Sequence, residues 1–357
     1  MRLEPAMVTR DPTPRGFLDR DVICDRDGRV WTVLGHIQPE DRVIAFLKYV
    51  PDEGGRWSRD GRRLRRVFWG GVQSVSDGMA HMPSEYQHND PHFGTLLPSV
   101  PIPRITEHHR PENRLRAILE CGARDPLEEK ALEFAELLAD STGVRIDSFG
   151  VAGSLAWHAH SPTRSDINMC VYGFENAWRL QEAYEHIPDM DGRVTLRENR
   201  DWLTAKSRIV SRVPKLDIED LHSLFERRRA LYLGNRCIGV TPILWSHEVP
   251  IPYLSERYQG LFSEPVKITF DVRDASYSLF LPSLYRGESG ELEAIGDQKV
   301  RRLMIYEGAF RGLAREGDSL EVVGTLQRVL KPPGEIMFYQ IMVGTKAGAG
   351  KEYIRLL

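Results

Sequence analysis

Apolar and polar positions alternate along both ends of the chain, which predicts strands in these regions. Residues 29–37 and 42–50 are rich in branched and aromatic side chains and flank a polar turn at 38–41. This pattern is typical of two paired strands. Near the carboxyl end, glycine and charged residues separate short runs of the same kind at 266–272, 278–281, 320–326 and 338–343. We therefore expect a β-meander or small barrel first and a compact antiparallel barrel last.

The middle of the chain has the longer apolar period of helices. Residues 113–121 and 125–140 are predicted to be helical, and the second helix has a strong start signal. Asp125 is placed as the N-cap, Pro126 as the first helical residue, and Glu128 follows the cap by three positions. Further helices are predicted over 174–186, ending at Pro188, and over 217–233, with Leu231 on the inward face.

Four prolines between residues 98 and 111 mark a linker between the first β-rich part and the helical part. The chain is thereby divided into an N-terminal β-rich domain at 1–112, a core at 113–245 and a C-terminal barrel-like domain at 246–357. The expected class is α+β, with a central mixed sheet and its helices flanked by two β-rich modules.

The candidate chemistry lies in the core, between residues 146 and 173. A buried strand leads into a tight turn at Gly153, where the missing side chain lets a ligand approach the backbone. Ser154 is placed to cap a short helix over 155–159, whose free N–H groups suit a phosphate. After a break, Asp166 and Asn168 alternate with apolar residues, and the period of two puts both on one face of a strand.

This segment resembles the nucleotidyltransferase superfamily related to DNA polymerase beta. The superfamily pattern is Gly-Ser, a spacer of about ten residues, and then Ser-Asp-x-Asp. Gly153, Ser154, Ser165 and Asp166 match this pattern, and Asn168 stands in place of the second Asp. A wider resemblance, to a mainly archaeal family of predicted nucleotidyltransferases, rests on residues 43–51, 125–128, 171–173, 306–308 and 317–318.

The resemblance implies that Gly153, Ser154 and Ser165 bind a nucleoside triphosphate and that Asp166 and Asn168 are the catalytic metal ligands. The implied metal is Mg²⁺ or Mn²⁺, because hard cations prefer oxygen and carboxylates offset their charge. The implied reaction is transfer of a nucleoside monophosphate to a hydroxyl, and the expected acceptor is RNA or protein. The superfamily's third acid lies on a later strand, but residues 237–244 contain none; the remaining candidates are Asp189, Asp191, Asp217 and Glu248.

Two other readings remain open. Asn168 offers a metal only a neutral oxygen, so the chain is alternatively a catalytically inactive nucleotide- or RNA-binding protein, a pseudoenzyme with the same fold. A scaffold that uses its β modules for protein contacts is the third possibility.

The composition of the chain does not distinguish these three functional hypotheses. The chain has 357 residues, 41% of them hydrophobic, and a formal charge of -3, which argues against a general polyanion binder. Its four cysteines are widely spaced and form no zinc or disulfide framework, and its histidines lack clean ligand spacing. No apolar run suits a membrane span, so the protein is expected to be cytoplasmic and without a membrane partner.

Two basic clusters have both a structural and a binding interpretation. Six arginines between residues 56 and 66 lie beside Trp57, Phe68 and Trp69; they suit RNA or, as the interspersed acids favour, a solvated hairpin. Arg227, Arg228 and Arg229 are placed to stabilise the end of a helix. Alternatively, one of them, or Lys206, Arg208 or Arg212 upstream, reaches the triphosphate.

Overall fold

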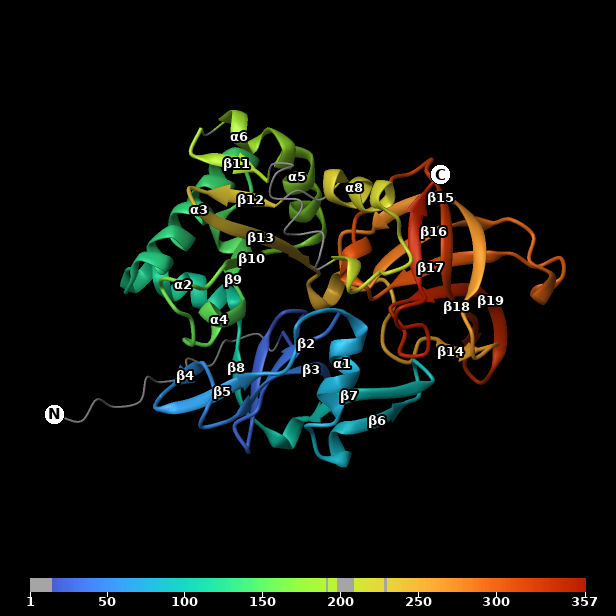
Figure 1. Ribbon diagram of the computed structural model, residues 1–357, viewed down its shortest axis with the longest axis horizontal. Helices are drawn as coiled ribbons and strands as arrows, with labels where there is room; N and C mark the ends of the chain where they lie inside the picture. The colour runs from blue at the N-terminus through green and yellow to red at the C-terminus, as the bar shows by residue number, and fades with distance from the viewer. Residues whose placement is uncertain (1–14, 191, 198–208, 228–229) are drawn as a thin grey trace.

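The computed structural model describes residues 15–190, 192–197, 209–227 and 230–357. They form three sheets with helices gathered mainly around the central one (Figure 1). The expected α+β class is therefore confirmed. None of the helices in these ranges is long and apolar enough to cross a membrane.

The N-terminal part is an eight-stranded sheet with the main order β4-β5-β3-β2-β1-β8, and β6 and β7 extend it beside β3. The predicted hairpin is confirmed, because Val30 of β2 pairs with Tyr49 of β3. The helix α1 spans Gly71–Met79 and packs near β3. The strands are β1 (Val22–Asp25), β2 (Val30–Val33), β3 (Arg42–Pro51), β4 (Trp57–Arg59), β5 (Arg62–Arg66), β6 (Gln87–Asp90), β7 (Thr95–Pro101) and β8 (Ile105–His109).

The predicted proline linker is wrong, because most of that segment forms β7 and β8. The first half of β7 pairs with β6 as far as Pro98, and the second half pairs with β3 as far as Pro101. Each ladder thus ends at a proline, where the missing N–H costs little. β8 then closes the edge of the sheet by pairing with β1.

The central part has the sheet order β11-β12-β13-β10-β9, in which β10 and β13 are parallel and the other pairs antiparallel. Its core joins Phe134 and Leu138 of α3 to Ile167, Met169 and Val171 of β10, all fully buried. Its strands are β9 (Phe149–Val151), β10 (Ile167–Tyr172), β11 (Val194–Leu196), β12 (Leu231–Leu233) and β13 (Arg236–Ile243), and its helices are α2 (Pro111–Cys121), α3 (Pro126–Thr142), α4 (Gly153–Ala156), α5 (Phe174–Ala183) and α6 (Ile187–Met190).

Two helix boundaries differ from expectation. The last predicted helix is α8 (Ile218–Arg227), and Leu231 lies instead in β12, buried between β11 and β13. Sheet pairing there outweighs the helical spacing of the leucines. Pro188 does not stop the helical segment either, because it lies in the first turn of α6, where no intrahelical donor is needed.

The C-terminal part is a barrel, since the pairings β18-β15-β16-β17-β19-β18 form a closed ring. It is antiparallel except for β17 and β19, which are parallel. Residues 278–280 form a turn and not the predicted strand; β16 begins after the proline at 282. The strands are β14 (Arg257–Gly260), β15 (Val266–Tyr277), β16 (Ser283–Ser289), β17 (Val300–Ile305), β18 (Ser319–Lys331), β19 (Glu335–Val343) and β20 (Tyr353–Leu356).

Candidate functional site

The glycine turn and the polar strand lie against each other. β9 runs antiparallel to β10, and α4 connects them through a turn at Gly153. Gly153 has φ +63°, and a Cβ there would lie 2.9 Å from Nδ2 of Asn168. The Ala152 N–H donates to the Asn168 carbonyl at 2.7 Å. Only glycine therefore allows this close approach of the turn to Asn168.

The two serines meet beside this turn, but Ser154 is not the predicted cap. α4 begins at Gly153 with Ala152 as its N-cap, and no side chain caps it. Instead the Ser154 hydroxyl donates to Ser165 Oγ at 3.4 Å, and Ser165 Oγ also accepts from the Ser161 N–H at 2.9 Å. The serines thus fasten the loop between α4 and β10, which fixes the start of the polar strand.

Asp166 and Asn168 are both exposed at the start of β10. The parallel strand β13 lies directly beside them, and Asn168 is in register with Gly239. Cys237 occupies the β13 position next to Asp166; burial raises the pKa of its thiol, and the Asp166 charge adds to this rise. The strand nearest to the proposed metal ligands therefore offers a glycine and a protonated thiol and no carboxylate.

The candidate third acids do not complete the site in the described residues. No group of three or more possible metal ligands in the described ranges contains Asp166. Asp217 accepts the Glu219 and Asp220 N–H groups, and Glu248 accepts those of Phe174 and Trp245. Asp189 is exposed on α6, 3.8 Å from His186, and Asp191 lies outside the described residues.

A cavity of about 220 Å³ lies beside Asn168, between the central sheet and the barrel. Gly239 and Thr241 of β13 form part of its wall, and Arg227 and Arg311 bring positive charge to it. Arg227 Nη1 is buried without a hydrogen-bond partner among the described residues, while Nη2 lies 3.7 Å from Asp318 Oδ2. Such a guanidinium group suits an anionic ligand.

The basic residues proposed to reach a phosphate do not all lie at the same cavity. Arg227 lines the cavity beside Asn168, whereas Arg212 lines a different cavity, against the backbone of Gly70. Lys206, Arg208, Arg228 and Arg229 lie outside the described residues. Arg311, far along the chain in the barrel, was missed because no local spacing connects it with β10.

A buried ionic network connects α2 and α3 to α4. Arg114 of α2 forms an ion pair with Glu128 of α3, both nearly inaccessible, and also donates to the Leu155 carbonyl at 3.2 Å. Glu128 in turn accepts the Arg124 N–H at 3.0 Å. This network joins α2 and α3 to the turn that carries Gly153.

Asp125 and His160 extend this network. Asp125 caps α3, as predicted, by accepting the Leu127 and Glu128 N–H groups, and its other oxygen lies 2.7 Å from His160 Nε2. Burial alone would raise the pKa of Asp125, but His160 and the two amides outweigh it, so the pKa lies below its usual value. His160 was missed as a partner because it lies 35 positions from Asp125.

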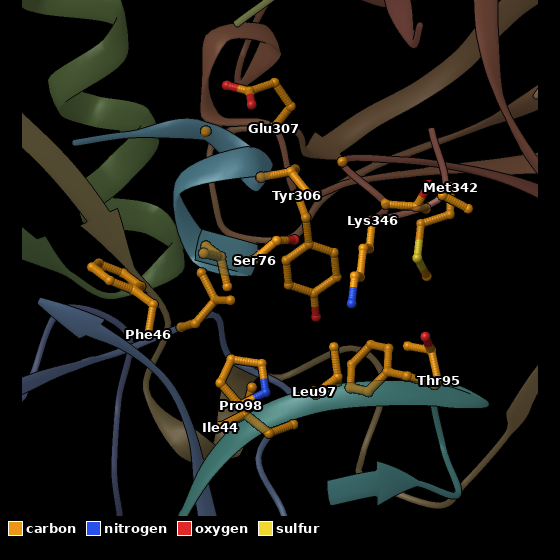
Figure 2. Close-up of a pocket in the computed structure, with 18 of the residues that line it drawn as sticks. Ile44, Phe46, Ser76, Thr95, Leu97, Pro98, Tyr306, Glu307, Met342 and Lys346 are labelled. Carbon is orange, nitrogen blue, oxygen red and sulfur yellow. The ribbon is translucent and has the colours of Figure 1, made fainter. Parts of the chain in front are cut away.

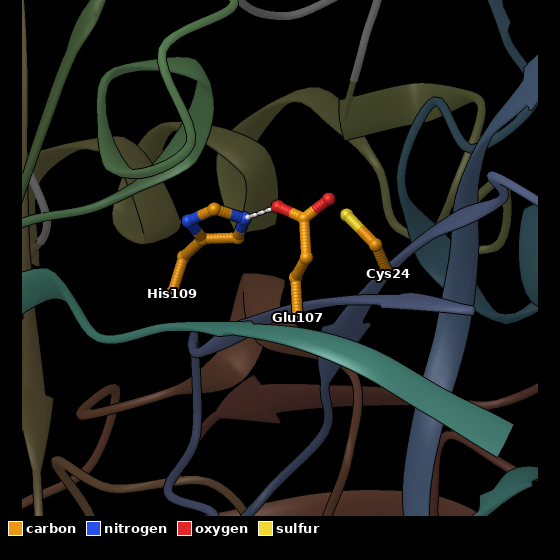
Figure 3. A group of neighbouring side chains, drawn as sticks. All are labelled: Cys24, Glu107 and His109. Atoms are coloured by element: carbon orange, nitrogen blue, oxygen red, sulfur yellow. Dashed lines mark hydrogen bonds and ion pairs between the residues drawn. The ribbon is translucent and has the colours of Figure 1, made fainter. Parts of the chain in front are cut away.

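A cluster of possible metal ligands lies on the N-terminal sheet (Figure 3). Cys24 of β1 pairs in register with Glu107 of β8, and Glu107 Oε2 lies 2.8 Å from His109 Nε2. Arg59 from β4 donates to Glu107 at 2.7 Å and lies 3.1 Å from the same His109 nitrogen. Because a guanidinium already occupies the place of a cation, this cluster fits a salt bridge better than a metal.

Comparisons with known proteins leave the activity open. Over 352 residues the chain is 25% identical to an uncharacterized protein of Methanocaldococcus jannaschii, which covers 94% of this chain and 98% of that protein. No family model matches the chain, and no solved structure matches it significantly.

Proposed function

We propose that the protein binds a nucleoside triphosphate beside β10 and transfers its nucleoside monophosphate to a hydroxyl acceptor. In this proposal Gly153, Ser154 and Ser165 hold the nucleotide, and Asp166 and Asn168 hold Mg²⁺ or Mn²⁺. The observation that carries it is the approach of Gly153 to Asn168, which places the turn directly beside the proposed metal ligands.

The cavity beside Asn168 supports an anionic ligand. Its volume of about 220 Å³ is below the range of about 300–1,000 Å³ typical of pockets that enclose a drug-sized ligand. The cavity therefore suits the phosphates, with the rest of the nucleotide outside it. Arg227 and Arg311 would balance charge that Asp166 and one metal ion leave uncompensated.

The lack of a second carboxylate favours another candidate function, nucleotide binding without catalysis. Carboxylates hold a divalent cation because they neutralise it, which the amide of Asn168 does not do. With Gly239 and Cys237 as the neighbours on β13, the described residues supply only Asp166 as an anionic ligand on this face. A pseudoenzyme would retain the phosphate-binding groups and lose the metal.

The acceptor of the nucleotide is proposed from the arginine-rich segment. The arginine-rich segment forms the β4-β5 hairpin, where Arg65 pairs with Asp52 and Arg59 with Glu107. Trp69 is 63% exposed nearby, with the Arg66 guanidinium 4.6 Å from its ring centre. An exposed ring and arginines suit RNA as the acceptor.

Calorimetric titration tests these functions. The four ribonucleoside triphosphates are titrated with Mg²⁺, Mn²⁺ or chelator into the native protein, Asp166→Ala and Asn168→Asp. We expect metal-dependent binding in the native protein, its loss in Asp166→Ala, and tighter metal binding in Asn168→Asp. Asp297→Ala, which removes an exposed acid of the barrel, is the matched control.

The outcomes separate the two functions. Binding that depends on metal only in Asn168→Asp, with metal-independent binding in the native protein, supports the pseudoenzyme. Pyrophosphate release by the native protein in the presence of RNA supports the transferase. Equal nucleotide binding by the native protein and Asp166→Ala in the presence of metal would refute the metal assignment.

A further inference from the structure

Another cavity, of about 430 Å³, lies between the N-terminal sheet and the barrel (Figure 2). Its walls come from α1, β3 and β7 on one side and from β18, β19 and the loops after β17 and β19 on the other. This volume falls within the range of about 300–1,000 Å³ of pockets that bury a drug-sized ligand. None of its lining residues also lines the cavity beside Asn168.

Most of the wall is apolar. Ile44 and Phe46 project from the same face of β3, Leu97 projects from β7, and Val72 and Val75 form the half-buried face of α1. Figure 2 shows Ile44, Phe46 and Leu97 around one space. Displacement of water from a half-covered apolar face by an apolar ligand lowers the free energy and therefore favours binding.

One end of the cavity is polar and carries positive charge. Tyr306 and Lys346 both extend toward the same space, above β7 (Figure 2). Neither the Tyr306 hydroxyl nor the Lys346 ammonium has a hydrogen bond or ion pair with a described residue. Burial raises the pKa of Tyr306 well above its usual value, so the phenol stays a neutral hydrogen-bond donor. Lys346 is exposed, which places this polar end at the solvent.

Two arginines, Arg20 and Arg212, also line the wall. Arg20 Nε lies 3.4 Å from Asp19 Oδ2. Arg212 and Glu307 flank Gly71, since a Cβ there would lie 3.2 Å from Arg212 Cγ and 3.5 Å from Glu307 Oε2. Lys346 is the cation that extends into the cavity beside Tyr306 (Figure 2).

The cavity has walls that are fixed by close backbone packing. A Cβ on Gly94 would lie 2.3 Å from the Tyr258 carbonyl oxygen, and a Cβ on Gly344 would lie 2.5 Å from the Glu307 nitrogen. These glycines join the β6-β7 turn to β14 and the end of β19 to the segment after β17. A pocket held in this way is preformed, which lowers the entropy lost on binding.

From these features we infer that the cavity binds an amphipathic anion. Its apolar chain or ring lies between α1, β3 and β7, and its carboxylate or phosphate group lies at the solvent end. There Lys346 pairs with the anionic group and the Tyr306 hydroxyl donates a hydrogen bond to it. The site is separate from the proposed nucleotide site and does not depend on it.

Three probes that share an apolar chain test this inference: decanoate, decyl phosphate and neutral decanol. Each is titrated into the full chain, below the concentration at which it forms micelles, and displacement of anilinonaphthalene sulfonate fluorescence is measured. We expect saturable binding of both anions and weaker binding of decanol. A preference between decanoate and decyl phosphate identifies the headgroup.

Three variants separate the polar end from the apolar wall. Lys346→Glu is expected to weaken both anions by about tenfold and to leave decanol unchanged, and Tyr306→Phe is expected to weaken the anions to a smaller extent. Val75→Trp fills the apolar end and is expected to remove binding of all three. Lys331→Glu is the matched control, because Lys331 is an exposed barrel lysine outside the cavity wall.

The inference is overturned if no probe binds saturably, or if Lys346→Glu and Lys331→Glu reduce anion binding equally. If Val75→Trp does not fold, the inference is still tested, because the comparison of the anions with decanol in Lys346→Glu does not depend on that variant. Nucleoside triphosphate titrations of the same variants are expected to match the native protein, so failure of one site is distinguished from failure of the other.

Discussion

Replacing Arg114 by Met is expected to destabilise the central part of the protein strongly. Arg114 and Glu128 are nearly inaccessible, with side-chain exposures of 6% and 2%. Removing the guanidinium leaves a buried carboxylate without its cation, and breaking such a pair costs about 3–5 kcal/mol. His160 is a poor substitute, because its Nε2 lies 4.0 Å from Glu128 and is already bonded to Asp125.

The double variant Arg114→Met/Glu128→Gln separates lost charge from lost packing. The amide of Gln keeps an oxygen for the Arg124 N–H, and the buried charge is gone. The destabilisation that remains in the double variant comes from the Leu155 carbonyl, which loses the Arg114 donor. An unsatisfied buried acceptor of this kind costs about 1–3 kcal/mol. The double variant is therefore expected to be more stable than Arg114→Met alone.

Urea unfolding followed by circular dichroism gives the free energies, and peptide-resolved hydrogen exchange assigns the loss to α2, α3 and α4. Arg145→Met serves as the control, because Arg145 and Asp147 form a pair with side-chain exposures of 82% and 52%; little change is expected. The reasoning fails if Arg114→Met resembles this control or if the double variant is no more stable than the single one.

Two further predictions concern the turn and the N-terminal sheet. Gly153→Ala is expected to cost about 1–2 kcal/mol from its positive φ and to weaken nucleotide binding, because the new methyl group displaces Asn168; unchanged affinity and stability would contradict the close approach. The hydrogen bond to His109, opposed by burial and helped by Arg59, lowers the pKa of Glu107 from 4.5 to about 2. The stabilising contribution of Glu107 is thus complete above about pH 4.5 and is lost as the pH falls toward 2, so the stability difference from Glu107→Gln in acid titrations should shrink over that range.

Local sequence predicted the elements whose physical causes are local. Asp125 and Pro126 start α3 as expected because a cap needs only the next few N–H groups. The hairpin of β2 and β3 also follows from residues that are close along the chain. The α+β class was predictable for the same reason.

Tertiary structure decided what depends on distant partners. Leu231 has helical spacing but joins a sheet because β11 and β13 offer it hydrogen-bond partners, and prolines 98 and 101 fit a strand because its pairing changes sides between them. The sequence marked Asp166 and Asn168, yet only the fold brings Arg311 to the cavity beside Asn168 and places Tyr306 and Lys346 across from α1. Packing of sheets that are far apart along the chain determines these neighbours, and residue spacing does not encode it.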